Sequence, residues 1–229
     1  MCGIIGYSGY RPAIPVVIEG LHHLEYRGYD SAGVASVQQG RFRIVRARGK
    51  LSALEDLLSK EPPSTATTGM GHTRWATHGE PAVRNAHPQM SNDGTLAIVH
   101  NGIIENFLPL KEFLLKQGKT FRSETDTEVI ANLLEYYYEQ ENDLMKAVRL
   151  TLGRIEGSYA LGILCADRPD SMIAVKKDSP LIFGFGEGEN FIASDVPAIL
   201  PYTRSVVYLN DGDMVVFTKN AAQFYDANG

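Results

Sequence analysis

The chain has 229 residues, 44% of them apolar and 21% charged, and a formal net charge of −5. This composition is typical of a globular protein with a substantial core, and the negative charge argues against binding to nucleic acid or to an anionic membrane. No apolar stretch approaches the length of a membrane span, and the first residues lack the pattern of a signal peptide. Two cysteines are too few for a disulfide framework, so we expect a cytoplasmic protein with Cys165 as an inert core residue.

Residue types and apolar periodicity predict strands and helices in the first part of the chain. In chain order we expect a strand at 3–7, a helix at 16–25, strands at 32–37 and 41–47, a helix at 51–58 and a strand at 70–75. Ser52 is the expected cap of the helix at 51–58. A long polar loop at 76–93 follows.

The second part is predicted to hold three helices followed by short strands. In order, these are a strand at 95–99, helices at 105–116, 126–140 and 143–155, and strands at 159–166, 172–175, 181–184, 190–193, 206–209 and 214–217. Strands at both ends with helices between them do not form a regular βαβ repeat. We therefore expect an α+β fold in which two largely antiparallel sheets pack together and helices cover their outer faces, in one domain.

Cys2 directly follows Met1, and the apolar strand at 3–7 would hold it in the body of the fold. If Met1 is removed, the thiol and a free α-amino group belong to one residue. That amine has an ordinary pKa of about 8 and could accept the thiol proton, so a cysteine nucleophile would need no histidine partner. The alternative is that Cys2 is an ordinary residue at a frayed terminus.

Two turn-like segments permit both a structural and a functional interpretation. Residues 27–33, Arg-Gly-Tyr-Asp-Ser-Ala-Gly, are either a helix-exit loop with an Arg27–Asp30 pair or part of a site. Asn101-Gly102 is a common turn pair that would close the strand at 95–99. Alternatively, the Asn101 side-chain amide and the Gly102 backbone N–H point at one site, where they would stabilise an oxyanion.

The segment 72–81 crowds reactive side chains at the end of a strand. Three imidazoles can form a catalytic zinc site, so binding of zinc by His72, His78 and His87 is an alternative. However, the spacing of His72 and His78 suits neither one helix face nor a zinc knuckle, and no acidic ligand recurs beside them. We therefore expect no metal site.

Two charged residues could together recognise an α-amino acid. Thr125 and Glu128 have the spacing of a capping box, which indicates a helix start in which Asp126 complements the helix dipole. Asp126 could instead bind a substrate ammonium, while Arg74 forms a bidentate pair with a carboxylate.

Taken together, five segments resemble the class II glutamine amidotransferases. They are 1–4 (Met-Cys-Gly-Ile), 27–33, 73–79 (Thr-Arg-Trp-Ala-Thr-His-Gly), 100–102 (His-Asn-Gly) and 123–128 (Ser-Glu-Thr-Asp-Thr-Glu). More narrowly, 73–81 and 190–195 (Asn-Phe-Ile-Ala-Ser-Asp) are similar to the glutaminase domains of enzymes that make glucosamine 6-phosphate from fructose 6-phosphate. The resemblance covers nearly the whole chain.

The resemblance implies the N-terminal-nucleophile hydrolase fold, a four-layer αββα sandwich. It implies that Cys2 is the nucleophile with its own amine as base, that Asn101 and Gly102 form the oxyanion hole, and that the segment from Arg27 to Asp30 supports the site. The implied substrate-binding residues are Arg74 and Asp126, for the glutamine carboxylate and ammonium, and Trp75, Thr77 and His78, in a loop that closes over glutamine.

The implied reaction is hydrolysis of L-glutamine to L-glutamate and ammonia through a γ-glutamyl thioester, without a cofactor. In the family's full-length, homo-oligomeric enzyme, a synthase half with sugar-isomerase-like modules uses the ammonia to make the amino sugar. This chain is expected to be one glutaminase domain, 1–229, without that half. The alternatives are the glutaminase domain of another class II amidotransferase, against which the segment 73–81 argues, and a non-catalytic amino-acid sensor.

Overall fold

The protein, seen in a computed structural model, is described here for residues 2–75 and 79–227. Within these residues the strands form a seven-stranded and a six-stranded sheet, and every pairing between named strands is antiparallel. The first sheet has the order β11 (Ser205–Tyr208), β9 (Ile182–Phe185), β10 (Asn190–Ala193), β1 (Gly3–Ser8), β4 (Thr68–Arg74), β2 (Ser31–Gln38) and β3 (Arg41–Arg48). The second has the order β13 (Ala222–Tyr225), β12 (Met214–Phe217), β8 (Met172–Lys177), β7 (Gly157–Cys165), β6 (Leu96–Ile104) and β5 (Gln89–Met90).

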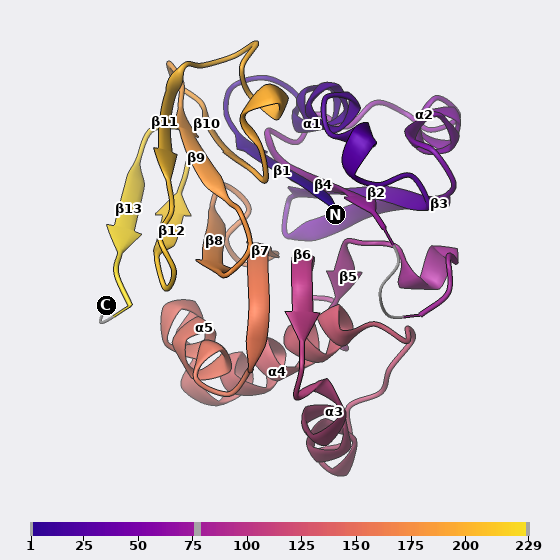
Figure 1. The fold of residues 1–229 in the computed structure, drawn as a ribbon, viewed down its shortest axis with the longest axis vertical. Helices are drawn as coiled ribbons and strands as arrows, with labels where there is room; N and C mark the ends of the chain where they lie inside the picture. Colours follow the sequence, from indigo (N-terminus) through magenta and orange to yellow (C-terminus); the bar gives the residue numbers. More distant parts are fainter. Residues whose placement is uncertain (1, 76–78, 228–229) are drawn as a thin grey trace.

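Helices cover the outer face of each sheet (Figure 1). On the first sheet lie α1 (Ala13–His22) and α2 (Leu51–Leu58). On the second lie α4 (Asp126–Glu141) and α5 (Leu144–Leu152), with α3 (Phe107–Lys116) against α4. Three short 3-10 helices, η1 (Glu25–Arg27), η2 (Val83–Asn85) and η3 (Val196–Ala198), lie in the connections. No helix in the described part of the chain has both the length and the apolar character needed to cross a bilayer.

Three buried clusters show why the sheets and helices form four layers. Successive side chains of a strand point to opposite faces of its sheet. In β1, Ile5 packs in the cluster under α1 and α2, whereas Ile4 packs in the cluster between the sheets. In β6, Leu96 and Ile98 pack under α4, whereas Val99 packs between the sheets. Because both faces of the central strands are covered, strands such as β1 and β7 consist largely of buried residues, and the predicted αββα sandwich is confirmed.

Several predicted element boundaries were wrong. The first helix begins at Ala13, three residues earlier than predicted. Pro15 lies in its first turn, where a backbone N–H would have no partner within the helix, so the proline is tolerated there. Helix α2 begins at the predicted residue, but Ser52 does not cap it: its N-cap is Lys50, without a side-chain hydrogen bond. The polar loop predicted at 76–93 contains η2 and β5, and the final strand, β13, was not predicted.

The predicted cap of α4 is present in part. The Thr125 hydroxyl oxygen accepts a hydrogen bond of 3.3 Å from the Glu128 backbone N–H, as in a capping box. The Glu128 carboxylate, however, accepts from the backbone N–H groups of Arg122 (2.8 Å) and Ser123 (2.6 Å). The side chain of Glu128 therefore holds the chain before the helix, so the start of α4 is fixed from two sides.

Asn101 and Gly102 do not form the predicted turn. They lie inside β6, which continues to Ile104 and pairs with β7 along its whole length. Gly102 has a φ of +128°, and a Cβ there would lie 2.1 Å from the Ser158 carbonyl oxygen. Only glycine therefore fits at this position. The Asn-Gly pair, which suggested a turn, instead reflects the need for a glycine within a strand.

We expect the cluster between the sheets to dominate stability. Ile192 in β10 is fully buried in it, so Ile192→Ala should lower the free energy of unfolding by about 2–5 kcal/mol, measured by denaturant titration. Leu200→Ala is the control, because that side chain is half exposed, and it should change stability by less than about 1 kcal/mol. Equal losses at the two positions would contradict this assignment of the core.

Candidate active site

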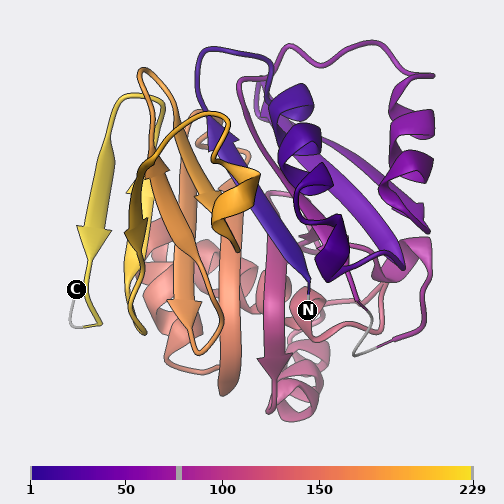
Figure 2. The ribbon, with the colours of Figure 1, turned by 45° about the horizontal axis from the view of Figure 1, so that its top comes forward.

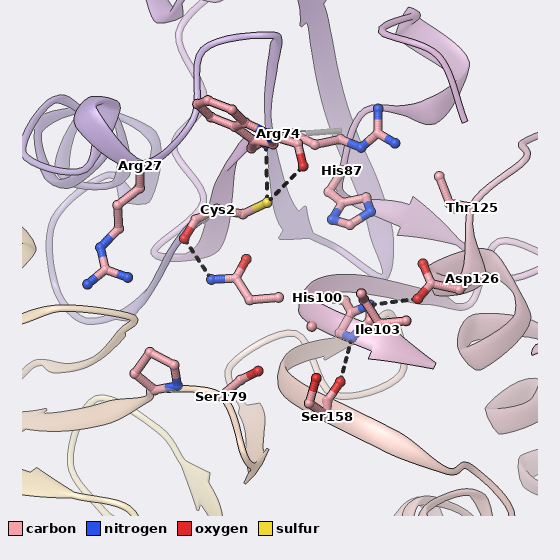
Figure 3. A pocket seen from close by; sticks show the side chains of 14 residues that line it. Cys2, Arg27, Arg74, His87, His100, Ile103, Thr125, Asp126, Ser158 and Ser179 are labelled. Atoms are coloured by element: carbon pink, nitrogen blue, oxygen red, sulfur yellow. Dashed lines mark hydrogen bonds and ion pairs between the residues drawn. The ribbon is translucent and has the colours of Figure 1, made fainter. Parts of the chain in front are cut away.

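A pocket of about 400 Å³ lies where the ends of the two sheets meet. Both ribbon views place the N-terminal end of β1 beside β6, which belongs to the other sheet (Figures 1 and 2). The lining residues come from both sheets, from η1, from the start of α4 and from the segment after β8. They are Cys2, Arg27, Arg74, Trp75, His87, His100, Asn101, Gly102, Ile103, Thr125, Asp126, Ser158, Ser179 and Pro180 (Figure 3).

The Cys2 thiol lies against the backbone of Trp75. The Trp75 N–H donates to Cys2 Sγ at 3.2 Å, and Sγ lies 3.5 Å from the Trp75 carbonyl oxygen. The antiparallel pairing of Gly3 with Thr73 brings the start of β1 to the end of β4 and so creates this contact. Burial raises the pKa of the Cys2 thiol, and the Trp75 N–H offsets this effect in part. The thiol is therefore protonated near neutral pH and needs a base to become a nucleophile.

Asn101 brings the second sheet to the same point. Its side-chain Nδ2 donates to the Cys2 carbonyl oxygen at 2.9 Å. An amide nitrogen has two N–H groups, so one further donor remains for the pocket that Asn101 lines. Gly102, the next residue of β6, also lines the pocket. The structure therefore brings the predicted nucleophile and the predicted oxyanion donors into one cavity.

Three buried histidines, His72, His87 and His100, lie near this contact. His72 Nε2 is 2.9 Å from Asn101 Oδ1 and 3.1 Å from the His100 carbonyl oxygen. His87 lies behind it, with Nδ1 3.3 Å from His72 Nε2. Burial lowers the pKa of His72 to about 3 and holds that of His87 well below its ordinary value. Both rings are therefore neutral across the physiological range.

The geometry gives no support to the zinc alternative. His78 lies outside the described residues, and the Nε2 of His72 faces Asn101 and a carbonyl oxygen. Among the described residues, the one group whose potential metal ligands converge is Asp93, Glu135 and Glu139, and it contains no histidine. The Lys119 ammonium binds both glutamates of that group and so supplies the positive charge there.

The pocket has a cationic and an anionic wall. Arg74 is buried at the end of β4, where its guanidinium donates to the Gly79 and Glu80 carbonyl oxygens at 3.3 and 3.4 Å. Asp126 is buried at the start of α4, and its carboxylate accepts from the Ile104 N–H at 2.9 Å. Opposite charges held at fixed places in one cavity suit a zwitterion, since each charged group of an α-amino acid would meet its counterpart.

The short helix η1 lines the pocket through its last residue, Arg27. Its guanidinium pairs with Asp195 at 2.5 Å, and this partner replaces the Arg27–Asp30 pair considered from sequence. Asp195 also accepts from the Tyr26 hydroxyl at 2.6 Å. Asp195 follows β10, so two segments distant in sequence meet beside Cys2. A Cβ at Gly28 would lie 2.7 Å from the Arg74 backbone carbon, which explains the glycine.

The predicted substrate loop is described only at its start. Thr77 and His78 lie outside the described residues. Trp75 is half exposed, and its ring contacts the edge of Tyr29 with 5.4 Å between centroids. Sequence reasoning did not find the roles of His87, Ser158, Ser179 and Pro180 in lining the pocket. No spacing signal marks them, because they reach the site from elements that are far apart in the chain.

Comparison with known proteins places this geometry in context. Residues 63–226 match the model of the family described as "Glutamine amidotransferase domain". The chain is 56% identical over its whole length to the glutamine–fructose-6-phosphate aminotransferase (isomerizing) of Caldanaerobacter subterraneus and 52% identical to that of Clostridium acetobutylicum. It spans about 37% of the length of each relative.

A solved structure supports the same fold. The glutamine phosphoribosylpyrophosphate amidotransferase of B. subtilis superposes with a TM-score of 0.84 at 25% identity, covering 99% of this chain and 49% of that one. Because the likeness covers nearly the whole chain, it confirms the predicted fold of the N-terminal-nucleophile amidotransferases.

Burial of neutral histidines makes stability depend on pH. The unfolded chain binds a proton on each imidazole below about pH 6.5, whereas folded His72 does so only near pH 3. Stability contributed by His72 is therefore lost as pH falls through this window, by about 1.4 kcal/mol per pH unit. His72→Gln should reduce the slope of unfolding free energy between pH 4 and 6 by that amount. The matched control, His23→Gln at an exposed position, should not; equal slopes in all three proteins would contradict the prediction.

Proposed function

The chain belongs to the glutamine amidotransferase family, and from this we propose that it hydrolyses L-glutamine to L-glutamate and ammonia through a thioester on Cys2. The observation that carries the proposal is that Cys2 and the Asn101 amide line the same pocket. The Asn101 amide donates a hydrogen bond of 2.9 Å to the Cys2 carbonyl oxygen, which holds it beside the thiol of that residue. A nucleophile and an oxyanion donor held together are the two groups that acyl transfer requires.

The base in this proposal is the α-amine of Cys2 after removal of Met1. The buried thiol has a raised pKa, so a proton acceptor must be supplied. Two nearby imidazoles, His72 and His87, are poor bases: the pKa of His72 is about 3, and that of His87 lies well below its ordinary value. An amine with a pKa of about 8 is close to the value that proton transfer near neutral pH needs.

The steps balance without any cofactor. The amine takes the thiol proton, and the thiolate attacks the side-chain amide carbon of glutamine. The tetrahedral oxyanion then accepts hydrogen bonds from the Asn101 amide and the Gly102 N–H. The ammonium of Cys2 returns the proton to the leaving group, and ammonia departs. Water, deprotonated by the same amine, cleaves the γ-glutamyl thioester and releases glutamate and the thiol.

Recognition of glutamine is assigned to groups that do not react. We assign the substrate α-carboxylate to Arg74 and the α-ammonium to Asp126, because both charged groups are buried in the pocket wall. Trp75, Thr77 and His78 are proposed to close over the substrate, and the Arg27 segment to support the site. A reactive thiol must stay reduced, which favours a cytoplasmic location.

Similarity to the aminotransferases favours one use of the ammonia. We propose that this glutaminase domain, 1–229, serves glucosamine 6-phosphate synthesis from fructose 6-phosphate, together with a synthase half in a homo-oligomeric full-length protein. The support is 56% identity to a glutamine–fructose-6-phosphate aminotransferase, against 25% to the phosphoribosylpyrophosphate amidotransferase. The 229-residue chain itself should release glutamate and ammonia from glutamine without forming the amino sugar.

That experiment also separates catalysis from sensing. A non-catalytic amino-acid sensor would keep the charged pair Arg74 and Asp126 but release no glutamate. Turnover that is lost with a chelator and restored by zinc would revive a metal mechanism. The mass of the mature N-terminus checks whether Cys2 comes first, since the proposed base exists only if Met1 has been removed.

The nucleophile is tested by labelling. A glutamine-like electrophile should add once per chain, at Cys2, because Cys165 is buried in the core and burial raises the pKa of its thiol. Mass spectrometry of the labelled peptides should show that Cys2→Ala abolishes labelling, whereas the matched variant Cys165→Ala leaves it unchanged. Cys2→Ser should fold but lose most turnover, because a hydroxyl is much harder to deprotonate. Labelling that persists in Cys2→Ala would remove the proposed mechanism.

Kinetics should separate recognition from chemistry. Arg74→Gln and Asp126→Asn should raise KM and weaken glutamate binding, because their partners do not change during the reaction. Asn101→Ala should instead lower kcat by roughly 10²–10³, with little effect on glutamate binding. Steady-state kinetics and calorimetry with glutamate measure the two effects. If Asn101→Ala abolishes glutamate binding but spares kcat, Asn101 belongs to the recognition residues.

A further inference from the structure

We propose that His72 is a positioning residue for the reaction, because its Nε2–H fixes the orientation of the Asn101 amide that stabilises the oxyanion. This inference rests on the proposed function. It assigns a task to a residue that does not line the pocket and that sequence reasoning considered only as a metal ligand. His72 would act through Asn101, without touching glutamine.

The contacts form a directed chain of hydrogen bonds. The Cys2 carbonyl oxygen can only accept, so the Asn101 atom 2.9 Å from it is the amide nitrogen. Asn101 Oδ1 then faces His72 Nε2 at 2.9 Å. The same Nε2 lies 3.1 Å from the His100 carbonyl oxygen, which again can only accept. His72 Nε2 therefore carries the proton, and its N–H serves both oxygen acceptors. His87 Nδ1, 3.3 Å from the same Nε2, then faces an N–H and is the unprotonated nitrogen of its ring.

Reversal of the amide would break this chain at two places. The Asn101 oxygen would face the Cys2 carbonyl oxygen, so two acceptors would meet without a proton between them. The amide nitrogen would face His72 Nε2, which would have to lose its proton to accept and would leave the His100 carbonyl without a donor. A buried polar group that loses its hydrogen-bond partner is unfavourable, so the observed orientation of the amide is favoured at both places.

The surroundings hold the His72 ring in place. Its strand, β4, lies between β1 and β2, and His72 pairs with Ile4 on one side and Gly33 on the other. The ring is fully buried and lies against that of His87, with 4.3 Å between centroids. Within the described residues, His72 Nδ1 is buried without a hydrogen-bond partner. The hydrogen bonds of the ring are thus concentrated at Nε2, the atom that meets Asn101.

Two matched substitutions separate the donor from the volume it occupies. Glutamine can place an N–H₂ group near the position of Nε2, whereas methionine has a similar length and no donor. His72→Met should lower kcat at least about tenfold, towards the 10²–10³ that loss of an oxyanion donor costs, with KM and glutamate affinity changed less than about threefold. His72→Gln should recover most of kcat. Equal kcat in the two variants would overturn the proposal.

A double-mutant cycle tests whether His72 acts through Asn101. If it does, His72→Met should cost little further kcat in an Asn101→Ala background, because the amide to be oriented is gone. Additive losses would show an independent, merely structural effect and overturn the inference. Met70→Leu, on the same strand and fully buried, controls for disturbance of β4 and should retain kcat.

The outcomes also distinguish this inference from the proposed function. If wild-type protein releases no glutamate, or if Asn101→Ala keeps its kcat, the proposed function or the oxyanion assignment fails. If Asn101→Ala loses kcat and folded His72→Met does not, only the inference fails. Should His72→Met not fold, ¹⁵N NMR of the wild-type imidazoles decides: we expect His72 protonated at Nε2 alone at pH 7, and protonation at Nδ1 would overturn the proposal.

Discussion

The hydrogen bond from Asn101 Nδ2 to the Cys2 carbonyl oxygen joins the two sheets at the pocket, and the geometry of the site depends on it. Cys2 directly precedes β1 of one sheet, whereas Asn101 lies on β6 of the other. Neither sheet contains both groups. Their relative position is set by the cluster of buried side chains between the sheets, which includes Ile4 and Val99. The core therefore fixes the positions of Cys2 and Asn101 relative to each other, because interior packing is dense.

Burial around that bond determines the charge states of the site. The same desolvation that keeps His72 and His87 neutral also raises the pKa of the Cys2 thiol. Neutral imidazoles can hold fixed hydrogen bonds over a wide pH range, but they cannot serve as bases near pH 7. His72 and His87 are therefore suited to support, which agrees with the proposal that the amine of Cys2 transfers the proton. In a region of low dielectric, such a network is favourable only when its donors and acceptors are matched.

Local patterns predicted most elements because each depends on nearby residues. Strands β10 and β12 and helix α2 were predicted with their observed bounds, because short apolar runs mark the two strands and an amphipathic pattern marks the helix. The failures arose where distant residues decide the outcome. The Asn101-Gly102 pair has a turn signal, yet pairing with β7 carries the strand through it. Strand β13 is half exposed at the edge of its sheet, so it lacks an apolar run that would mark it.

The sequence by itself determined the residue types of the candidate site: a thiol at position 2, an amide beside a glycine, and an arginine and an aspartate at the ends of predicted elements. Motif spacing was sufficient for these, because each motif is contiguous. Only the tertiary structure decided which groups meet. Arg27 pairs with Asp195 from a segment 168 residues away, and His72 bonds to Asn101 across two sheets. Such contacts arise from the packing of the layers and the antiparallel register of the strands. The periodicity of a short segment predicts neither of these.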